Sequence, residues 1–428
     1  MISNSVHVKI FTLLICVASV ILYVERQYLF SIFAGLFSLL IINLYNLKLN
    51  GLLSLITIFT LGSSLYVTAE PISLIFFDYS EHSISDIALL FVMGCIFMAC
   101  VFLGYHDKSD YTTIVSNYQR GVVGIFPFHL VLIIVIMVYI YLVYVDVGFA
   151  IGSLSRSESF QSRSVYLSII RTSFIALFIL YCVHLSREHG RRFFVYTIFI
   201  AFIFVELFVL GDRRLAISCI IVVMLLHKEK FSGKKGVIVI ASLFVVFSLF
   251  GLVRNQAIGS ALTNVNKENV SQKINPMSQD FGYFHRVGIE ILNARYDKVF
   301  MQTYVLSLSN LIPQYIYPNR YDGPSLWYVK TFHNDIYLMG GGLAFNSVIE
   351  SYMNFKYAGP VLVGLAVGFV LSIIASQSSN TPIYYFTSTI APFFMRMDSA
   401  GIVKSFAIFV CFYLFFYILS KRRAGFDR

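Results

Sequence analysis

Charged residues are scarce in this sequence. Asp, Glu, Lys and Arg make up 13% of its 428 residues, whereas hydrophobic residues make up 58%. Because soluble globular domains carry about 25% charged residues, this composition excludes a soluble enzyme. Acidic residues are the scarcer kind, 22 against 32 basic ones. In so apolar a chain the excess of Lys and Arg reports membrane topology, so no nucleic-acid partner is expected.

Several chemical motifs are also absent. The six cysteines all lie in apolar runs and none has CxxC spacing, which indicates buried small side chains rather than a disulfide framework or a zinc site. The sequence has no Walker A loop, dinucleotide fingerprint, HExxH or serine nucleophile elbow. The segment DYSEHSISD (78–86) could meet a divalent cation, but a solvated loop is the better interpretation because no DxD pair occurs. No metal and no other cofactor is expected.

Apolar runs long enough to cross ~30 Å of hydrocarbon recur along the whole chain. They predict an all-α polytopic integral membrane protein with about twelve transmembrane helices, forming a single transmembrane domain over residues 1–428. The alternating ten-residue segments of a membrane barrel are absent from the sequence. The expected spans are 6–24, 28–46, 51–69, 87–105, 125–145, 165–185, 193–210, 215–227, 237–253, 357–376, 383–395 and 402–420.

The short loops set the expected orientation. With the N-terminus in the cytoplasm, the Lys-rich segment HKEKFSGKKG (227–236) lies inside, and both termini are cytoplasmic. Residues 254–356 then form one long outward loop, which is too long to obey the charge rule. Within it, residues 299–317 are apolar but interrupted by polar residues, which predicts a helix at the membrane interface or packed on the bundle.

The basic residues expected on the outer face are arginines. Membrane topology depends on positive charge and does not distinguish lysine from arginine, so the use of arginine needs another reason. Guanidinium offers a permanently charged fork of donors that matches phosphate oxygens. Four of these arginines share one expected depth at the outer ends of spans, where they either extend to lipid phosphates or bind a lipid-linked diphosphate. We expect the diphosphate, held by Arg213, Arg214, Arg254 and Arg396, with Arg286 and Arg320 from the long loop.

Two segments of the long loop carry further candidates. In LIPQYIYPNRYDGPSLWYVKTFHND (311–335), aromatic rings could stack on sugars, although such rings are equally typical of a membrane interface. His333 and Asp335 are candidate general bases, against the more usual solvated loop side chains. The expected sugar-binding residues are Tyr317, Tyr321 and Trp327.

Two glutamates fall inside apolar segments. Glu350 lies in the helix that follows three consecutive glycines (340–342), and it is either paired with an arginine or catalytic. Glu206 lies within a predicted span, where it is a buried partner for an arginine or a proton-relay carboxylate.

The order of four motifs resembles the O-antigen polymerase family (Wzy), the oligosaccharide repeat-unit polymerases. These motifs are LGDRR (210–214), IPQYIYPNR (312–320), GGGLAFNSVIESYMNFKYAG (340–359) and RMD (396–398), and the resemblance covers about residues 205–400. It implies a GT-C-like polymerase or ligase architecture in the bacterial inner membrane, with a periplasmic active site lined by Arg213, Arg214, Arg254, Arg396 and Glu350. In this family the dipeptide Asn-Phe is often followed by a GxxG sequence, whereas here KYAG (356–359) follows it. The start of the next helix, at 356–359, is therefore the part of the resemblance that departs from the family pattern.

The resemblance also implies the reaction. A growing chain leaves its undecaprenyl diphosphate and joins a new undecaprenyl-diphosphate-linked oligosaccharide, so donor and acceptor are both lipid-linked. Membrane lipids and a chain-length regulator protein are the other expected partners. Two alternatives stay open, an O-antigen ligase and a lipid-linked oligosaccharide flippase. The long outward loop and the few intramembrane charges, Arg171, Glu206 and Lys404, favour an enzyme over a flippase.

Overall fold

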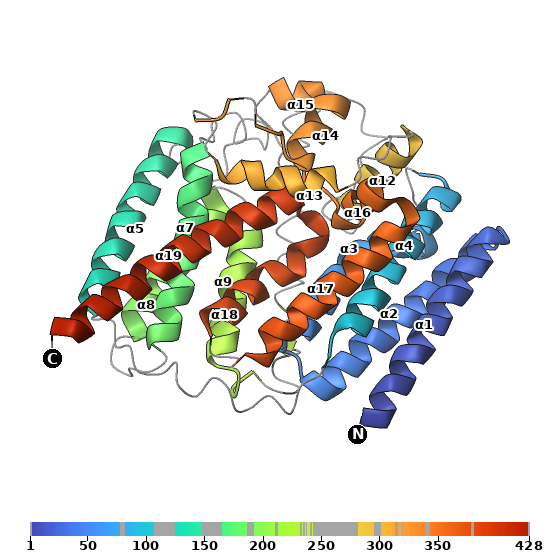
Figure 1. Ribbon diagram of the computed structural model, residues 1–428, viewed down its shortest axis with the longest axis horizontal. Helices are drawn as coiled ribbons and strands as arrows, with labels where there is room; N and C mark the ends of the chain where they lie inside the picture. The colour runs from blue at the N-terminus through green and yellow to red at the C-terminus, as the bar shows by residue number, and fades with distance from the viewer. Residues whose placement is uncertain are drawn as a thin grey trace.

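The computed structural model describes most of the chain in a series of ranges. These are residues 2–77, 82–106, 125–147, 165–185, 192–209, 213–231, 233, 236, 238–239, 242, 281–294, 301–312, 316–318, 320–338, 343–377 and 381–426. Every regular element in these ranges is a helix, as the apolar periodicity predicts. The long apolar helices stand side by side as a tilted bundle (Figure 1).

Eleven of the twelve predicted spans coincide with described helices, and the expected span 237–253 lies almost wholly outside the described residues. Six of the helices are long and apolar enough to cross a membrane, and four shorter apolar helices accompany them. The count of twelve therefore stays a prediction. The bundle helices are α1 (Ile2–Val24), α2 (Tyr28–Asn50), α3 (Leu55–Phe77), α4 (Ile84–Gly104), α5 (Ile125–Val147), α7 (Val165–Leu185), α8 (Arg192–Phe204), η2 (Val205–Val209), α9 (Arg213–Leu226), α17 (Gly359–Ser376), α18 (Pro382–Ile390), η7 (Ala391–Arg396) and α19 (Ser399–Phe426).

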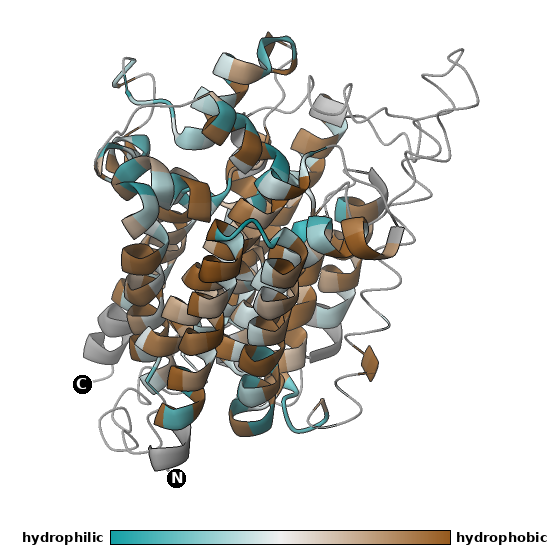
Figure 2. Ribbon diagram, turned by 90° about the vertical axis from the view of Figure 1, so that its right-hand side faces the viewer, coloured by the Kyte–Doolittle hydropathy of each residue, from teal (hydrophilic) through white to brown (hydrophobic). Residues whose placement is uncertain are grey.

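The described part of the predicted long loop is itself helical. Short helices cross one end of the bundle, whereas α1 begins and α19 ends at the opposite end (Figure 1). The bundle helices are predominantly apolar along their middle, and polar residues gather over the short helices (Figure 2). The short helices are α12 (Tyr283–Asn293), α13 (Gln302–Ser307), η5 (Leu308–Leu311), α14 (Pro324–Phe332), α15 (Asn334–Leu338), α16 (Ser347–Phe355) and η6 (Lys356–Ala358).

Glycines let α17 and α4 approach closely. A Cβ atom added to Gly364 would lie 2.7 Å from the carbonyl oxygen of Phe97, and one added to Gly368 would lie 2.2 Å from that of Val101. Small residues four positions apart are the usual means of close helix packing in membranes, because dispersion forces drive association there. The two glycines thus fix the position of α17 and of α16, which precedes it.

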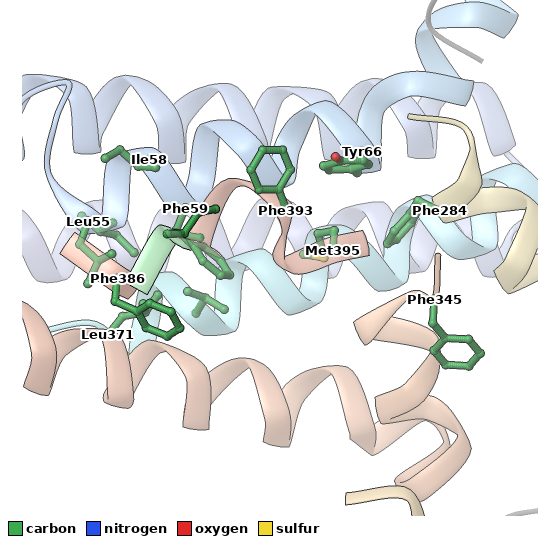
Figure 3. Packing of buried hydrophobic residues seen from close by; sticks show 14 of the residues in the cluster. Leu55, Ile58, Phe59, Tyr66, Phe284, Phe345, Leu371, Phe386, Phe393 and Met395 are labelled. Atoms are coloured by element: carbon green, nitrogen blue, oxygen red, sulfur yellow. The ribbon is translucent and has the colours of Figure 1, made fainter. Parts of the chain in front are cut away.

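The segment before α19 is held by a buried aromatic cluster. Alternate residues of η7, including Phe393 and Met395, are buried among side chains of α3 and α18 (Figure 3). Pro392 contacts Gly62 of α3, where an added Cβ would lie 2.3 Å from its Cα. The rings of Phe59 and Phe394 have centroids 5.3 Å apart. The packing of η7 against α3 therefore fixes the position of Arg396, the last residue of η7.

A buried ion pair joins the helices on the other side of the bundle. Arg171 of α7 donates from Nε to Oε1 of Glu206 over 2.9 Å and also binds Oε2 through a terminal nitrogen. The hydroxyl of Tyr139 on α5 donates to the same Oε1 over 3.0 Å. Glu206 lies in the π-helical segment η2. The structure therefore gives Glu206 an arginine partner, which is Arg171.

Candidate functional site

The amphipathic helix α12 presents three polar side chains on one face. Tyr283, Arg286 and Glu290 have i, i+3, i+7 spacing, which places them in a row. The opposite face is buried and contacts α4, where a Cβ added to Gly288 would lie 2.6 Å from Leu90. Because this face is fixed against the bundle, the polar row faces away from it.

The ring of Tyr283 lies between two guanidinium groups. The Cζ atom of Arg286 is 5.9 Å from the ring centroid, and the Cζ atom of Arg396 is 5.3 Å from it. Both distances are typical of cation–π contacts, which attract the cations to the ring without neutralising them. The Nε atom of Arg396 is buried, and no described residue accepts a hydrogen bond from it. Arg286 and Arg396, which we call the arginine pair, thus bring two positive charges to the same ring.

A histidine and a tyrosine share the carboxylate at the far end of the same row. Oε2 of Glu290 lies 2.9 Å from Nε2 of His333 and 2.5 Å from the hydroxyl of Tyr328. The Tyr328 hydroxyl is also 3.1 Å from Nε2 of His333. Burial and the hydrogen bond to Glu290 raise the pKa of Tyr328, so the phenol stays a proton donor.

This trio fixes the tautomer of His333. Glu290 accepts a hydrogen bond from Nε2–H, so the neutral ring carries its lone pair on Nδ1. Among the described residues none binds Nδ1, and the His333 side chain is 26% exposed. The imidazole can therefore accept a proton from a group that approaches it from outside, and the carboxylate would stabilise the resulting cation.

Glu350 is almost completely buried beneath this site, at 1% exposure. Its Oε1 accepts from the hydroxyls of Thr303 (2.9 Å) and Ser399 (2.5 Å), and its Oε2 accepts from the backbone N–H of Ser399 (2.9 Å). No arginine of the described ranges contacts it. Glu350 therefore joins α13, α16 and the first residue of α19, and its catalytic role stays a prediction.

Asp398 completes the N-terminal cap of α19. Its two oxygens accept from the backbone N–H groups of Gly401 (2.7 Å) and Ser325 (3.0 Å). Negative groups at a helix N-terminus are stabilised by the unpaired N–H groups there. Glu350 and Asp398 thus join α13, α14 and α16 to the start of α19. This start follows Arg396 in the sequence by three residues.

The other predicted site residues are dispersed. Arg214 is exposed at the start of α9. Arg320 donates to the carbonyl oxygen of Ile312 over 2.9 Å. Asp335 is exposed in the first turn of α15. The structure describes only the backbone of Arg213, and Arg254 lies outside the described residues.

The predicted sugar-binding aromatics differ in exposure. Tyr317 is 46% exposed, whereas Tyr321 and Trp327 are partly buried. Trp327 packs edge-on against Phe332, with ring centroids 6.0 Å apart. In the described ranges no group of three or more His, Cys, Asp or Glu side chains could hold a metal ion.

A comparison with protein families finds one family that matches nearly the whole chain. The family O-antigen polysaccharide polymerase Wzy matches residues 5–424. The chain belongs to this family. The resemblance predicted from four motifs is thus confirmed, over nearly the whole chain rather than residues 205–400 alone. No curated protein and no solved structure matches the chain.

Membership of Wzy establishes the general function. The protein is a multi-pass bacterial membrane protein of O-antigen polymerisation, and the family indicates a polymerising glycosyltransferase. Of the residues that the motifs singled out in this Wzy chain, the structure brings Arg286, Arg396 and His333 into one region.

Two residues of this Wzy site were missed by reading the sequence, whereas Tyr328 is one of the loop aromatics expected to stack on sugars. Glu290 was the decisive omission, because it is the partner of His333. Its spacing of four residues from Arg286 on an amphipathic helix was the available signal. Tyr283 resembled an ordinary interfacial aromatic, since its role depends on a contact with the distant Arg396.

Proposed function

We propose that the protein transfers the growing O-antigen chain from undecaprenyl diphosphate to the nonreducing end of a new lipid-linked repeat unit. The observation that carries this proposal is the placement of the His333–Glu290 pair and the arginine pair along one face of α12. The reaction needs a proton acceptor beside the attacking hydroxyl and cations beside the departing diphosphate. This face offers both.

The α12–α15 end of the bundle faces the periplasm in this proposal. The Lys-rich segment 227–236 directly follows α9, and the predicted inside loops carry most of the basic residues. Both features favour a cytoplasmic position for the end of the bundle opposite α12–α15. Both termini lie toward that opposite end (Figure 1), so they would be cytoplasmic in the inner membrane.

Arg286 and Arg396 would bind the diphosphate of the donor. Negative charge grows on the bridging oxygen as its bond to the anomeric carbon breaks, so fixed guanidinium groups stabilise the transition state more than the ground state. Tyr283 holds both groups in place before the substrate arrives. Because the arginines supply the positive charge, the proposal requires no metal ion.

His333 would act as the general base through Nδ1. The acceptor hydroxyl oxygen attacks the anomeric carbon and passes its proton to Nδ1, while the electron pair of the broken bond stays on the lipid diphosphate. Glu290 would stabilise the imidazolium that forms. Direct displacement of this kind inverts the anomeric configuration.

The length of the surface polysaccharide tests the proposal. A strain lacking its own polymerase gene is complemented at matched protein levels with wild type, Arg286→Gln, Arg396→Gln or His333→Ala. The matched control is Lys330→Gln, which alters an exposed lysine of α14 that pairs with Asp322. Wild type and the control should give a ladder of chain lengths, and the three site variants should give core with a single repeat unit.

Other gel patterns would indicate another function. If the strain without the gene places no repeat unit on the core, the protein is not the polymerase. Lipid-linked polymer accumulating outside would then indicate a ligase, and single lipid-linked units accumulating inside would indicate a flippase. Full ladders from all three site variants would instead remove the proposed site.

A further inference from the structure

A row of apolar side chains points outward from α13 and η5. The opposite side of this segment is fixed, because Thr303 donates to Glu350 and the Ser307 hydroxyl lies 2.6 Å from that of Ser399. Both Thr303 and Ser307 are buried. The exposed residues, which we call the α13–η5 stripe, are Met301, Val305, Leu308, Leu311, Ile312 and Ile316.

The stripe is continuous with a surface that faces lipid. α13 and η5 lie across the beginning of α19 (Figure 1). The segment Ser399–Ile418 of α19 is apolar enough to span a membrane, and only 11% of its apolar window is buried inside the protein. Apolar side chains at this junction therefore meet hydrocarbon rather than water.

Two cations lie beside the stripe. Arg320 is held there by donating from Nη1 to the carbonyl oxygen of Ile312 over 2.9 Å. Gly323 contacts α19, since an added Cβ would lie 2.8 Å from the Cβ of Ala400. Lys404 is one turn beyond Ala400 on the same helical face. The segment that carries Arg320 therefore packs against the start of α19, the helix that carries Lys404.

Neither cation has a carboxylate partner within the described ranges. The acidic groups nearby are already bound: Asp322 to Lys330, Asp398 to two backbone N–H groups, and Glu350 to Thr303 and Ser399. A lysine within a membrane-spanning helix is costly unless it pairs with an anion or serves a function. The Arg320–Lys404 pair therefore places two positive charges next to an exposed apolar surface.

Resting on the proposed function, we infer that the Arg320–Lys404 pair binds the diphosphate of the acceptor, with its polyprenyl chain along the α13–η5 stripe. The acceptor reacts at its nonreducing end, and its own diphosphate is at the other end of the repeat unit. Its diphosphate must then bind away from the arginine pair on α12 and η7, which serves the donor. A second cationic site on separate elements, α19 and the segment after η5, meets this requirement.

Substrates that can play only one role test the assignment. A lipid-linked repeat unit whose acceptor hydroxyl is methylated can act only as donor. A repeat unit joined to undecaprenyl diphosphate through a carbon in place of the anomeric oxygen can act only as acceptor. Purified protein in nanodiscs converts the two into a single dimer, so KM is measured for each substrate separately. The free repeat-unit oligosaccharide, without lipid diphosphate, serves as a second acceptor.

The double variant Arg320→Gln/Lys404→Gln should raise KM for the lipid-linked acceptor at least tenfold. KM for the donor and the rate with the free oligosaccharide should stay within twofold of wild type, which also shows that the variant is folded. Lys404→Arg keeps the charge and should keep the acceptor KM near wild type. Lys330→Gln should leave all three values unchanged.

Three results would overturn the inference. Equal increases in both KM values would mean that the pair does not discriminate acceptor from donor. An unchanged acceptor KM would mean that the pair meets ordinary phospholipid headgroups instead. A rate that falls equally with the free oligosaccharide would assign the pair a structural role. Failure of the wild type to form any dimer would instead contradict the proposed function itself.

Discussion

Nε2 of His333 lies 2.9 Å from Oε2 of Glu290, and the hydroxyl of Tyr328 lies 2.5 Å from the same oxygen. One carboxylate thus orients the ring that we propose as the base. Glu290→Gln should lower kcat by about two to three orders of magnitude, within the ~10²–10⁴-fold that general-base catalysis contributes. KM should change little, because Glu290 does not contact substrate in the proposal. A variant that lost only substrate affinity would contradict this role.

Tyr283 should act through its ring and not through its hydroxyl. Each cation–π contact at an exposed site is worth about 0.5–1 kcal/mol, and Tyr283 makes one with Arg286 and one with Arg396. Tyr283→Leu should therefore raise the donor KM by roughly fivefold to thirtyfold, whereas Tyr283→Phe should stay near wild type. Equal losses from the two substitutions would show that the hydroxyl, which both of them remove, is what matters.

Glu350 should behave as a structural residue. Glu350→Ala leaves the buried donors of Thr303 and Ser399 without an acceptor, at about 1–3 kcal/mol for each unsatisfied group. Thermal unfolding in detergent, followed by size-exclusion chromatography, should show a lower midpoint and less folded protein, with activity lost in proportion. Folded Glu350→Ala protein of normal stability and no activity would assign Glu350 to catalysis instead.

The buried pair of Arg171 and Glu206 should show strong coupling. Removing either partner alone leaves an uncompensated buried charge, which typically destabilises by about 3–5 kcal/mol. Arg171→Met and Glu206→Met should each lower the unfolding midpoint sharply, and the double variant should recover most of the loss. A double variant whose loss equals the sum of the two single losses would mean that the pair is not energetically coupled.

His285 should make the protein sensitive to acid. It is completely buried beside α4, neither ring nitrogen has a hydrogen-bond partner in the described ranges, and burial, aided by His82, lowers its pKa to about 3. The unfolded chain binds a proton near pH 6.5 and the folded chain does not. Stability from this group is therefore complete above about pH 6.5 and is lost as pH falls toward 3.

At pH 5 the free energy of unfolding should be lower by about 2 kcal/mol because of His285. This value follows because pH 5 is about one and a half units below the unfolded pKa, and each unit corresponds to about 1.4 kcal/mol. His285→Phe removes the titrating group and keeps an aromatic ring of similar size. The difference between unfolding midpoints at pH 7.5 and pH 5 should be smaller in this variant than in wild type. An unchanged difference would show that His285 is not a source of the acid sensitivity.

The spans could be predicted from the sequence because they depend on local composition. Eleven predicted spans coincide with helices since apolar length alone determines them. The short helices were harder, because their polar faces depend on contacts with distant segments. Glu290 and His333 are 43 residues apart, and no local pattern joins them. Glu350 was predicted to be functional from its apolar surroundings, yet the hydroxyl and amide donors that satisfy it come from α13 and α19.

The arginines show the same limit. Arg396 was expected at the site from its depth before the last span, and the structure places it against Tyr283. Arg320 was expected beside it, but its bond to Ile312 holds it near η5 instead. The sequence analysis assigns both arginines to one diphosphate site. The contacts that position the two arginines come from different segments, Tyr283 of α12 for Arg396 and Ile312 for Arg320.

The rate of a single glycosyl transfer by purified His333→Ala protein tests the central claim most directly. With the donor-only and acceptor-only substrates, kcat should fall by about 10²–10⁴-fold relative to wild type while both KM values stay within a few-fold. Lys330→Gln, measured alongside, should match wild type. A kcat for His333→Ala equal to that of wild type would contradict the account, because the proton of the acceptor hydroxyl would then be taken by another group.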